Sequence, residues 1–265
     1  MKKILSLILA VAMCATLFVG CDADTAADSD LAYIKDKGEM VIGMTLFAPM
    51  NYYDDSNTLI GFETEFAKAV CEKLGVTPKF VEIDWNSKEI ELNAKNIDCI
   101  WNGMTITDER KANMDISSPY MKNRQVMVVK AENLDKYASS VAGATIVAEA
   151  GSAGEELATT DEFFKDASFT PVDSMAKALM DVKAGTSDVA IVDYVTSIGS
   201  IGEGTDFADL VTVEALEFAP EEYGIAFRKG GDTAAAVNDA IAALIADGTL
   251  DAIAKNYKLE NLLIK

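Results

Sequence analysis

Apolar positions along the chain follow two spacings, one typical of strands and one typical of helices. Continuous apolar runs of a few residues predict strands at 40–43, 79–82, 97–101, 125–129, 145–148, 189–192 and 223–227. Between these runs, apolar residues recur every three or four positions and predict helices at 62–74, 174–184 and 237–245, and a further short helix is expected at 90–94. Strands that alternate with helices form parallel sheets covered by helices, so the pattern predicts an α/β protein.

The first 20 residues have the pattern of an export signal. Lys2 and Lys3 precede an uncharged run at 4–20, and its last residues with Cys21 resemble a bacterial lipobox. We therefore expect residues 1–20 to be a lipoprotein signal peptide and Cys21 to carry lipid, palmitate included. Residues 21–29 then form an acidic linker to the cell membrane. An uncleaved anchor stays open, because the run lies between roughly 7–15 residues for a signal core and about 20 for a spanning helix.

Composition narrows the functions that such a fold can have. The 265 residues include 43 acidic and 23 basic side chains, which gives a net charge of −20. A polyanion repels nucleic acid and anionic membrane surfaces, so neither is expected as a partner. The chain has no histidine, which excludes Ser-His-Asp and Cys-His nucleophiles and histidine-ligated metals. We expect neither a metal nor a cofactor.

Two cysteines remain in the body of the chain once Cys14 and Cys21 are assigned to the export signal. Cys71 lies in a predicted helix and Cys99 in a predicted strand, both in apolar surroundings. Two buried thiols and a disulfide both fit this placement. The chain has no Cys-x-x-Cys pair, so metal or redox chemistry at these residues is not expected.

Polar residues follow the predicted strands at three places. Asn102 comes directly after 97–101 and Asp193 directly after 189–192, in matching contexts. Glu149 follows the strand before Asp193 and adds a second carboxylate. Ligands of open parallel sheets bind at the carboxyl ends of strands. The sequence leaves two interpretations open for such residues, a ligand contact or a cap for the next loop.

The remaining candidate ligand-binding features are one arginine, one glycine-containing loop and two aromatic side chains. Arg110 lies at the start of a predicted helix that Thr107 caps, where the helix dipole disfavours a cation. Arg110 is therefore either an exposed surface residue without a binding role or a residue held by an anion. The glycine-containing loop 151–154 precedes another helix and offers backbone amides to an anion, although a glycine pair alone is more often a turn. Phe47 and Trp85 fit a core or the wall of a small-molecule site.

Several ordered stretches, from about residue 31 to the C-terminus, resemble one family. The stretch 61–70 resembles its first helix, and 103–111 followed by 117–120 is its most specific motif. The stretch 222–226 resembles its second crossing strand, and 246–251 resembles its closing helices. The family is that of the bacterial extracellular solute-binding proteins, family 3. These are the polar amino-acid receptors of ABC importers and include the histidine- and glutamine-binding proteins.

The resemblance implies a role for each candidate residue. Arg110 would clamp the α-carboxylate of an amino acid, Asp193 would take the α-ammonium, and Phe47 and Trp85 would be aromatic walls. Glu149 stands where relatives vary with their ligand, and with Asp193 it favours a polar or cationic side chain. The residues expected to bind the ligand are Arg110, Asp193, Thr105, Asn102, Phe47, Trp85, Glu149, and Ser152 and Ala153 through their backbone amides. No catalytic residue is expected.

The resemblance also implies a fold, a location and partners. It implies the type II periplasmic-binding-protein fold, with two α/β lobes joined by two hinge strands near 122–128 and 221–227. Lobe 1 would span 30–122 and 222–265, and lobe 2 would span 123–221. The expected protein is a monomeric, extracytoplasmic, lipid-anchored receptor that delivers an amino acid to an ABC permease. The alternatives are an exported dehydratase-like enzyme with Glu149 as its acid, and a sensory amino-acid receptor.

Overall fold

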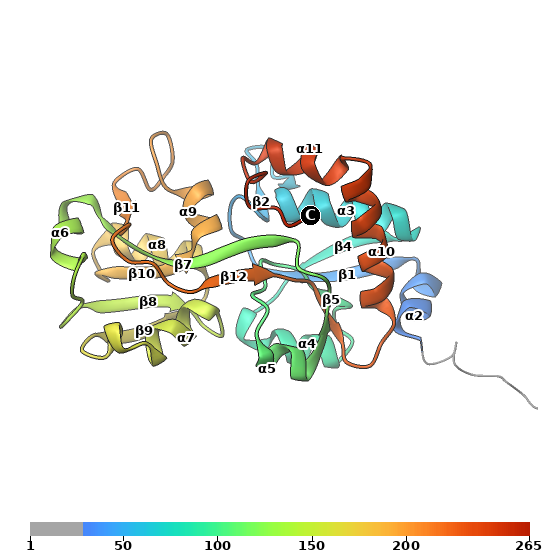
Figure 1. The fold of residues 1–265 in the computed structure, drawn as a ribbon, viewed down its shortest axis with the longest axis horizontal. Coiled ribbons are helices and arrows are strands. Elements are labelled where there is room, and N and C mark those ends of the chain that lie inside the picture. Colours follow the sequence, from blue (N-terminus) through green and yellow to red (C-terminus); the bar gives the residue numbers. More distant parts are fainter. Residues whose placement is uncertain (1–28) are drawn as a thin grey trace, which may run out of the picture.

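The computed structural model describes residues 29–265 as two α/β lobes joined by a pair of strands (Figure 1). Lobe 1 denotes the half built on a five-stranded sheet, and lobe 2 the half built on a six-stranded sheet. Within the described residues no helix is both long and apolar enough to cross a membrane. The predicted signal peptide 1–20, Cys21 and most of the predicted linker lie outside the described residues.

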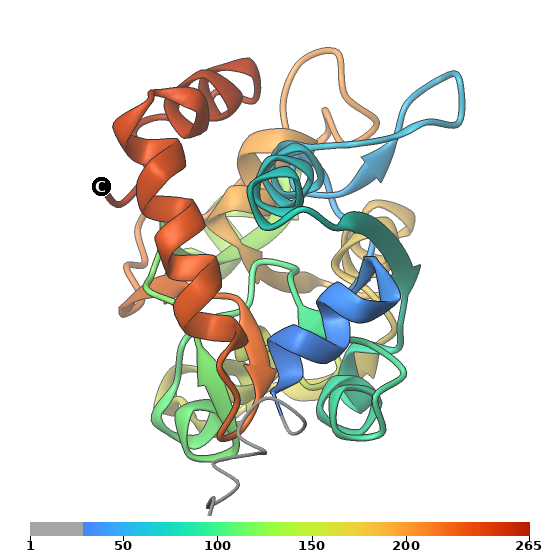
Figure 2. The ribbon, with the colours of Figure 1, turned by 90° about the vertical axis from the view of Figure 1, so that its right-hand side faces the viewer.

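Lobe 1 combines parallel and antiparallel strands. In spatial order its sheet contains β4 (Thr77–Glu82), β1 (Glu39–Met44), β5 (Cys99–Ile100), β13 (Ala226–Arg228) and β6 (Met114–Ile116). Strand β1 is parallel to β4 and β5, whereas β13 is antiparallel to β5 and β6. The helices are α2 (Asp30–Lys37), α3 (Phe62–Leu74), α4 (Lys88–Asn93), α5 (Asp108–Asn113), α10 (Thr233–Ala246) and α11 (Thr249–Asn256). Figure 2 faces this lobe, with α2 and α10 toward the viewer.

Lobe 2 has the same mixed character. Its sheet follows the order β11 (Leu210–Thr212), β7 (Met121–Lys130), β10 (Val189–Asp193), β8 (Thr145–Glu149) and β9 (Ser168–Val172), and β12 (Pro220–Tyr223) also pairs with β7. Strands β10, β8 and β9 are parallel, and β7 is antiparallel to β10. The helices are α6 (Leu134–Tyr137), α7 (Ala153–Thr160), α8 (Met175–Ala184) and α9 (Tyr194–Ser200). The remaining short elements are the hairpin β2 (Tyr52–Tyr53) and β3 (Leu59–Ile60) in lobe 1, and the 3-10 turns η1 (Trp85–Ser87), η2 (Ala131–Asn133) and η3 (Glu162–Phe164).

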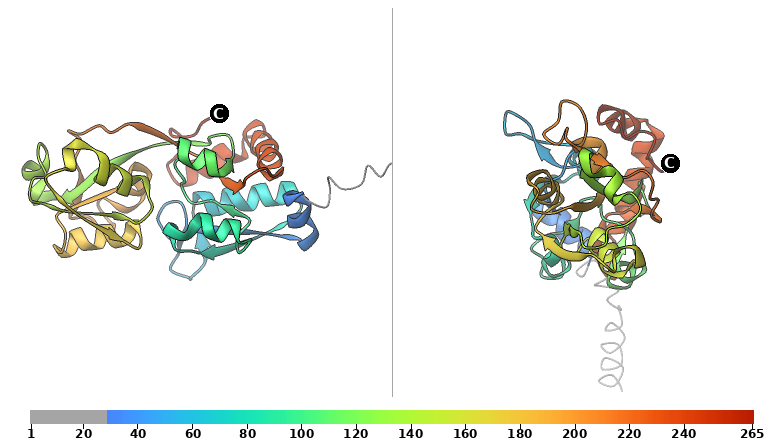
Figure 3. Two further views of the ribbon diagram at one scale, coloured as in Figure 1. Left: turned by 90° about the horizontal axis from the view of Figure 1, so that it is seen from below. Right: turned by 90° about the vertical axis from the view of Figure 1, so that its left-hand side faces the viewer.

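The chain crosses between the lobes along β7 and returns along β12. The first residues of β7 pair with β12, and its later residues pair with β10 and β11. Figure 3 shows these strands as the connection between the lobes. The sequence predicts one strand at 223–227, but the structure has two, because Gly224 and Ile225 carry the chain from the hinge pair into the lobe 1 sheet. Only glycine fits there, since an added Cβ would lie 2.6 Å from Ile116.

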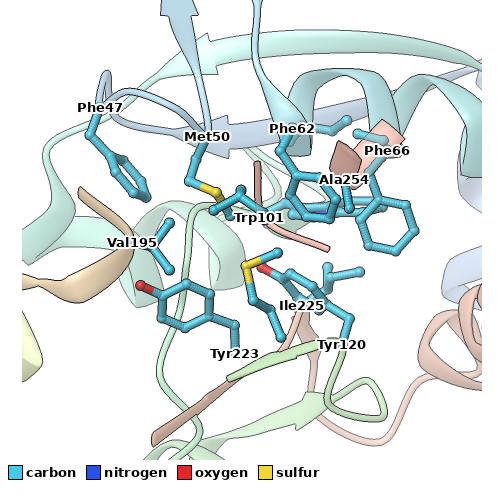
Figure 4. Packing of buried hydrophobic residues seen from close by; sticks show 14 of the residues in the cluster. Phe47, Met50, Phe62, Phe66, Trp101, Tyr120, Val195, Tyr223, Ile225 and Ala254 are labelled. Atoms are coloured by element: carbon cyan, nitrogen blue, oxygen red, sulfur yellow. The ribbon is translucent and has the colours of Figure 1, made fainter. Parts of the chain in front are cut away.

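The largest cluster of buried side chains connects α3 with the hinge. The Phe66 ring lies 5.0 Å from that of Trp101 and 5.5 Å from that of Tyr120, which in turn lies 6.3 Å from Tyr223 on β12 (Figure 4). Val195 of lobe 2 belongs to the same cluster, so packing is continuous from lobe to lobe. The hinge strands are therefore anchored by an aromatic core, which fixes the residues that they carry.

The fold prediction is confirmed, including two α/β lobes joined by two strands. The lobe boundaries at 122/123 and 221/222 stay a prediction, because β7 and β12 pass without a break between the two sheets. Cys71 and Cys99, for which a disulfide was open, are both free and buried. Burial raises the pKa of both thiols, so neither is a reactive thiolate.

Candidate functional site

The carboxyl ends of strands from both lobes meet in the interface between them. Asn102 follows β5 in lobe 1, while Glu149 and Asp193 are the last residues of β8 and β10 in lobe 2. All three residues are buried, with exposed fractions of 2–3%. The carboxyl ends of strands are where open α/β sheets hold their ligands, and these three predicted site residues lie there.

Asp193 is held by neutral donors on the two hinge strands. Its Oδ1 accepts hydrogen bonds from Asn123 Nδ2 at 3.1 Å and Gln125 Nε2 at 2.5 Å. Its Oδ2 accepts one from the Tyr223 hydroxyl at 2.7 Å. Burial, and then the charge of Glu221, raise the pKa of Asp193. Among residues 29–265, no lysine or arginine forms an ion pair with this carboxylate.

Glu221 on β12 is a neighbour of this site that the sequence did not indicate. Its Oε2 accepts hydrogen bonds from Thr105 Oγ1 at 3.0 Å, Asn123 Nδ2 at 2.9 Å and Gln125 Nε2 at 3.0 Å. Glu221 therefore shares both hinge amides with Asp193. The Thr105 hydroxyl, predicted to aid the ligand carboxylate, is bound to Glu221, so its contact with a ligand stays a prediction.

Arg110 crosses the interface. Thr107 caps α5 as predicted, and its Oγ1 accepts from the Arg110 amide. The Arg110 guanidinium is buried and donates to the Thr105 carbonyl at 2.7 Å and, in the opposite lobe, to the Gly151 carbonyl at 3.2 Å. Burial lowers its pKa, and the charge of Asp193 is the largest of those that oppose this. Because Arg110 is buried, the interpretation of it as an exposed surface residue without a role is wrong.

Lys88 is a second buried cation in the interface, and the sequence reasoning missed it. Its Nζ donates to the Gly151 carbonyl at 3.0 Å and to the Trp85 carbonyl at 3.1 Å, and lies 4.8 Å from the centre of the Trp85 ring. Burial and the charge of Arg110 lower the pKa of Lys88 to about 8. The signal that marked Arg110, a cation at a helix start, also marks Lys88 as the first residue of α4.

Glu149 is the least satisfied carboxyl group of the site. It is 2% exposed, and its Oε1 has no hydrogen-bond partner. Burial and the charge of Asp193 raise its pKa to about 8, although Lys88 and the Thr45 hydroxyl oppose the rise. Glu149 is therefore mainly protonated at neutral pH.

Three predicted contacts have other partners in this arrangement. The Asn102 side chain accepts from the Thr45 amide at 2.9 Å and donates to the Thr45 carbonyl at 2.8 Å, which ties the end of β1 to that of β5. Ser152 caps α7, which begins at Ala153, and the Ser152 amide donates to the Glu149 carbonyl at 3.2 Å. Ligand contacts by Asn102, Ser152 and Ala153 stay predictions.

Phe47 and Trp85 are both buried, in two different hydrophobic clusters. They are 5% and 4% exposed, and the Phe47 Cζ would lie 2.9 Å from a Cβ added at Gly103. Trp85 instead contacts Lys88. Both rings belong to hydrophobic clusters, and their role as ligand walls stays a prediction.

A cavity of about 710 Å³ borders the site on the side of the hinge strands. Both lobes and the hinge line it, and its walls include Thr105, Gln125, Ala153 and Glu221. It has ample room for a molecule of amino-acid size.

Similarity to known proteins agrees with this geometry. Residues 40–260 match the family model of the bacterial extracellular solute-binding proteins, family 3. The chain belongs to this family. It is 31% identical over 250 residues to the L-cystine-binding protein TcyJ of Escherichia coli K12, which covers 92% of each chain. It is 27% identical over 256 residues to the arginine-binding extracellular protein ArtP of Bacillus subtilis, covering 95% of this chain and 96% of that protein.

Solved structures of this family have the same fold. An ABC uptake transporter substrate-binding protein from Streptococcus pneumoniae with bound histidine superposes with a TM-score of 0.79 at 30% identity. The match covers 90% of this chain and 100% of that one. The ancestral amino-acid-binding protein AncCDT-1, a precursor of cyclohexadienyl dehydratase, superposes with a TM-score of 0.75 at 27% identity over 86% and 99% of the two chains. The predicted family and fold class are confirmed.

Proposed function

We propose that this protein captures a polar or cationic L-amino acid between its lobes and delivers it to the permease of an ABC importer. The observation that carries the proposal is the convergence of Arg110 and Asp193 in one buried interface, where no ion pair joins them. A zwitterion supplies both missing partners, because its carboxylate suits the guanidinium and its ammonium suits Asp193. The relatives named above bind cystine, arginine or histidine, all of them amino acids.

Closure of the lobes gives this recognition its strength. The two hinge strands allow one lobe to turn against the other, as in other hinge-closing receptors. An arginine–carboxylate pair gains energy when water leaves its surroundings, because the effective dielectric constant falls. Arginine also offers two parallel donors, which a lysine cannot. We therefore propose that the ligand replaces the Gly151 carbonyl as an acceptor for Arg110.

A thermal-shift screen tests the proposal. The purified protein is scanned with the twenty amino acids, ornithine and L-cystine. A ligand present at 100 times its dissociation constant adds about 2.7 kcal/mol to the free energy of unfolding. At least one amino acid should raise the melting temperature by several degrees. If none does so at millimolar concentration, the proposed function is wrong.

The proposed location is the outer side of the cell membrane, with Cys21 as lipid anchor. The lipobox-like residues before Cys21 and the family's extracellular class support it. Mass spectrometry of protein purified from a bacterial membrane fraction should give a chain that begins at Cys21 and carries added lipid.

A dehydratase-like enzyme is the alternative function, and one observation favours it. Glu149 is a buried carboxyl group with a pKa of about 8, which suits a general acid at neutral pH. Proton NMR of a ligand incubated with the protein separates the two functions. A receptor leaves the ligand spectrum unchanged, whereas an enzyme produces new signals over time.

A further inference from the structure

Glu63, the second residue of α3, is a buried carboxyl group with an exposed fraction of 1%. The helix dipole favours an acid in the first turn of a helix, but an exposed acid would serve that purpose equally well. In the described part of the chain, no lysine or arginine forms an ion pair with Glu63, and burial raises its pKa to about 7. Burying a carboxyl group is costly unless its oxygens are hydrogen-bonded, so its partners should explain its place.

Three donors from separate segments occupy both carboxyl oxygens of Glu63. Its Oε1 accepts hydrogen bonds from the Gly103 amide at 2.8 Å and from the Tyr120 hydroxyl. Its Oε2 accepts one from Asn51 Nδ2 at 3.0 Å. Asn51 precedes α3, Gly103 follows β5, and Tyr120 directly precedes β7. None of these three donors belongs to α3, so the carboxylate connects other segments rather than capping its own helix.

Two of these segments carry residues of the candidate site. Phe47 lies in the same turn as Asn51, and its amide donates to the Asn51 carbonyl at 2.8 Å. Gly103 lies two residues before Thr105, whose carbonyl accepts from the Arg110 guanidinium at 2.7 Å. The two segments also meet, because a Cβ added at Gly103 would lie 2.9 Å from the Phe47 Cζ. The same carboxylate thereby fixes the neighbours of both the predicted aromatic wall and the predicted carboxylate clamp.

The third segment leads through the hinge to lobe 2. The Tyr120 amide donates to the Tyr223 carbonyl at 3.1 Å, and the centres of the two rings lie 6.3 Å apart (Figure 4). The Tyr223 hydroxyl donates to Asp193 at 2.7 Å. Two tyrosines in contact with each other therefore connect Glu63 with the carboxylate that we expect to bind the ammonium group of an amino acid.

We infer that Glu63 is a positioning residue, which sets the arrangement of the aromatic wall, the arginine clamp and the hinge around a bound amino acid. It acts through its three donors, because both of its oxygens are already occupied within the core. This inference rests on the proposed function and adds to it a residue that itself contacts no ligand. A role in stability alone would lower the free energy of unfolding and leave the affinity unchanged, whereas a positioning role lowers the affinity.

Calorimetry on two variants of Glu63 tests the inference. The probe is whichever of the twenty amino acids, ornithine and L-cystine raises the melting temperature of the parent protein most. Glu63→Met fills a similar volume but leaves all three donors without their acceptor, so binding must reorder the segments, and affinity should fall roughly 10-fold or more. Glu63→Gln keeps a carbonyl oxygen for Gly103 and Tyr120, and its amide group donates to Asn51 once the Asn51 amide turns over. Glu63→Gln should therefore bind the probe within about 3-fold of the parent.

A third variant and a control separate positioning from stability. Tyr120→Phe keeps the ring and removes one donor, so it should weaken binding by about 3-fold or more in the parent and add nothing in Glu63→Met. Glu65→Met is the matched control on α3. The Glu65 carboxylate accepts from the hydroxyl of Tyr257, which follows α11, so this variant should lower the free energy of unfolding in urea without changing the affinity.

Each outcome decides the matter. Unchanged affinity in Glu63→Met, or in Tyr120→Phe where Glu63→Met does not fold, overturns the inference and leaves the proposed function intact. Equal losses of affinity in Glu63→Gln and Glu63→Met also overturn it, because the hydrogen bonds of the carboxyl group would then have no part in binding. If no amino acid binds the parent protein, the proposed function fails and the inference fails with it.

Discussion

Gly199 offers a way to oppose closure without touching the charged groups. It lies on α9 of lobe 2 and faces Pro49 of lobe 1 at very close range. A Cβ added at Gly199 would lie 2.5 Å from both the nitrogen and the Cδ of Pro49. Ordinary contacts of a Cβ begin near 3.4 Å, so Gly199→Ala forces the lobes apart by about 1 Å at this point.

The size of the effect follows from this overlap. Inserting a methyl group into a packed contact costs roughly 1–3 kcal/mol. The same displacement widens the interface that Arg110 and Lys88 span, where both now reach the Gly151 carbonyl, at 3.2 and 3.0 Å. If the bound ligand requires the closed arrangement, Gly199→Ala weakens binding by roughly 5- to 150-fold.

The assay compares affinity with stability. Isothermal titration calorimetry gives the affinity of each variant, and urea unfolding gives the free energy of unfolding without ligand. In the open state the new methyl group meets no clash, and alanine exceeds glycine in helix propensity by about 1 kcal/mol. Ligand-free Gly199→Ala should thus be as stable as the parent or slightly more so. Ser200→Ala, one residue further on α9, is the control and should bind normally.

Two results would refute this reasoning. Unchanged affinity in Gly199→Ala would mean that the bound state does not bring Gly199 against Pro49. A loss of unfolding free energy in Gly199→Ala without ligand, as large as its loss of binding free energy, would mean that the lobes close equally well without ligand.

The remaining predictions concern the charged groups and the N-terminus. Arg110→Lys should weaken amino-acid binding by roughly 2–4 kcal/mol, the scale for a truncated buried charge pair, and unchanged affinity in calorimetry would reject the clamp. Because the folded-state pKa of Glu149 is raised to about 8, the unfolded chain loses this proton first as the pH rises. Ligand-free stability should therefore fall between about pH 4.5 and 8 by up to roughly 5 kcal/mol from this group. Glu149→Gln should remove that part of the fall in urea unfolding at pH 5 and 8, and parallel curves would contradict it. Cys21→Ala should yield protein without lipid, and a lipid-bearing variant in mass spectra would show that the anchor lies elsewhere.

Many of the helices and strands could be predicted from the local spacing of apolar residues. Phe62, Phe66 and Val70 recur at helical spacing, and all three are fully buried on α3. The strands β1, β8 and β10 are continuous apolar runs and are buried along nearly their whole length. Their carboxyl ends locate the site, because parallel strands in one sheet end at a common edge. Arg110 was conspicuous because its position opposes the helix dipole.

Other features depend on contacts between distant parts of the chain. Whether Asn102 faces a ligand or Thr45 depends on how β1 and β5 pair, which local pattern does not encode. The sequence around Glu221 does not indicate a site residue. Its role follows only from the pairing of β12 with β7, which brings Asn123 and Gln125 within hydrogen-bonding distance of its carboxylate. Lys88 carried the same signal as Arg110, but only the closed interface shows that both reach one carbonyl.

A crystal structure of the protein with its tightest-binding amino acid tests the central claim most directly. We predict a ligand enclosed between the lobes, with its α-carboxylate within about 3 Å of the Arg110 guanidinium and its α-ammonium equally near Asp193. A ligand bound outside the interface, with Arg110 still on the Gly151 carbonyl, would contradict the account.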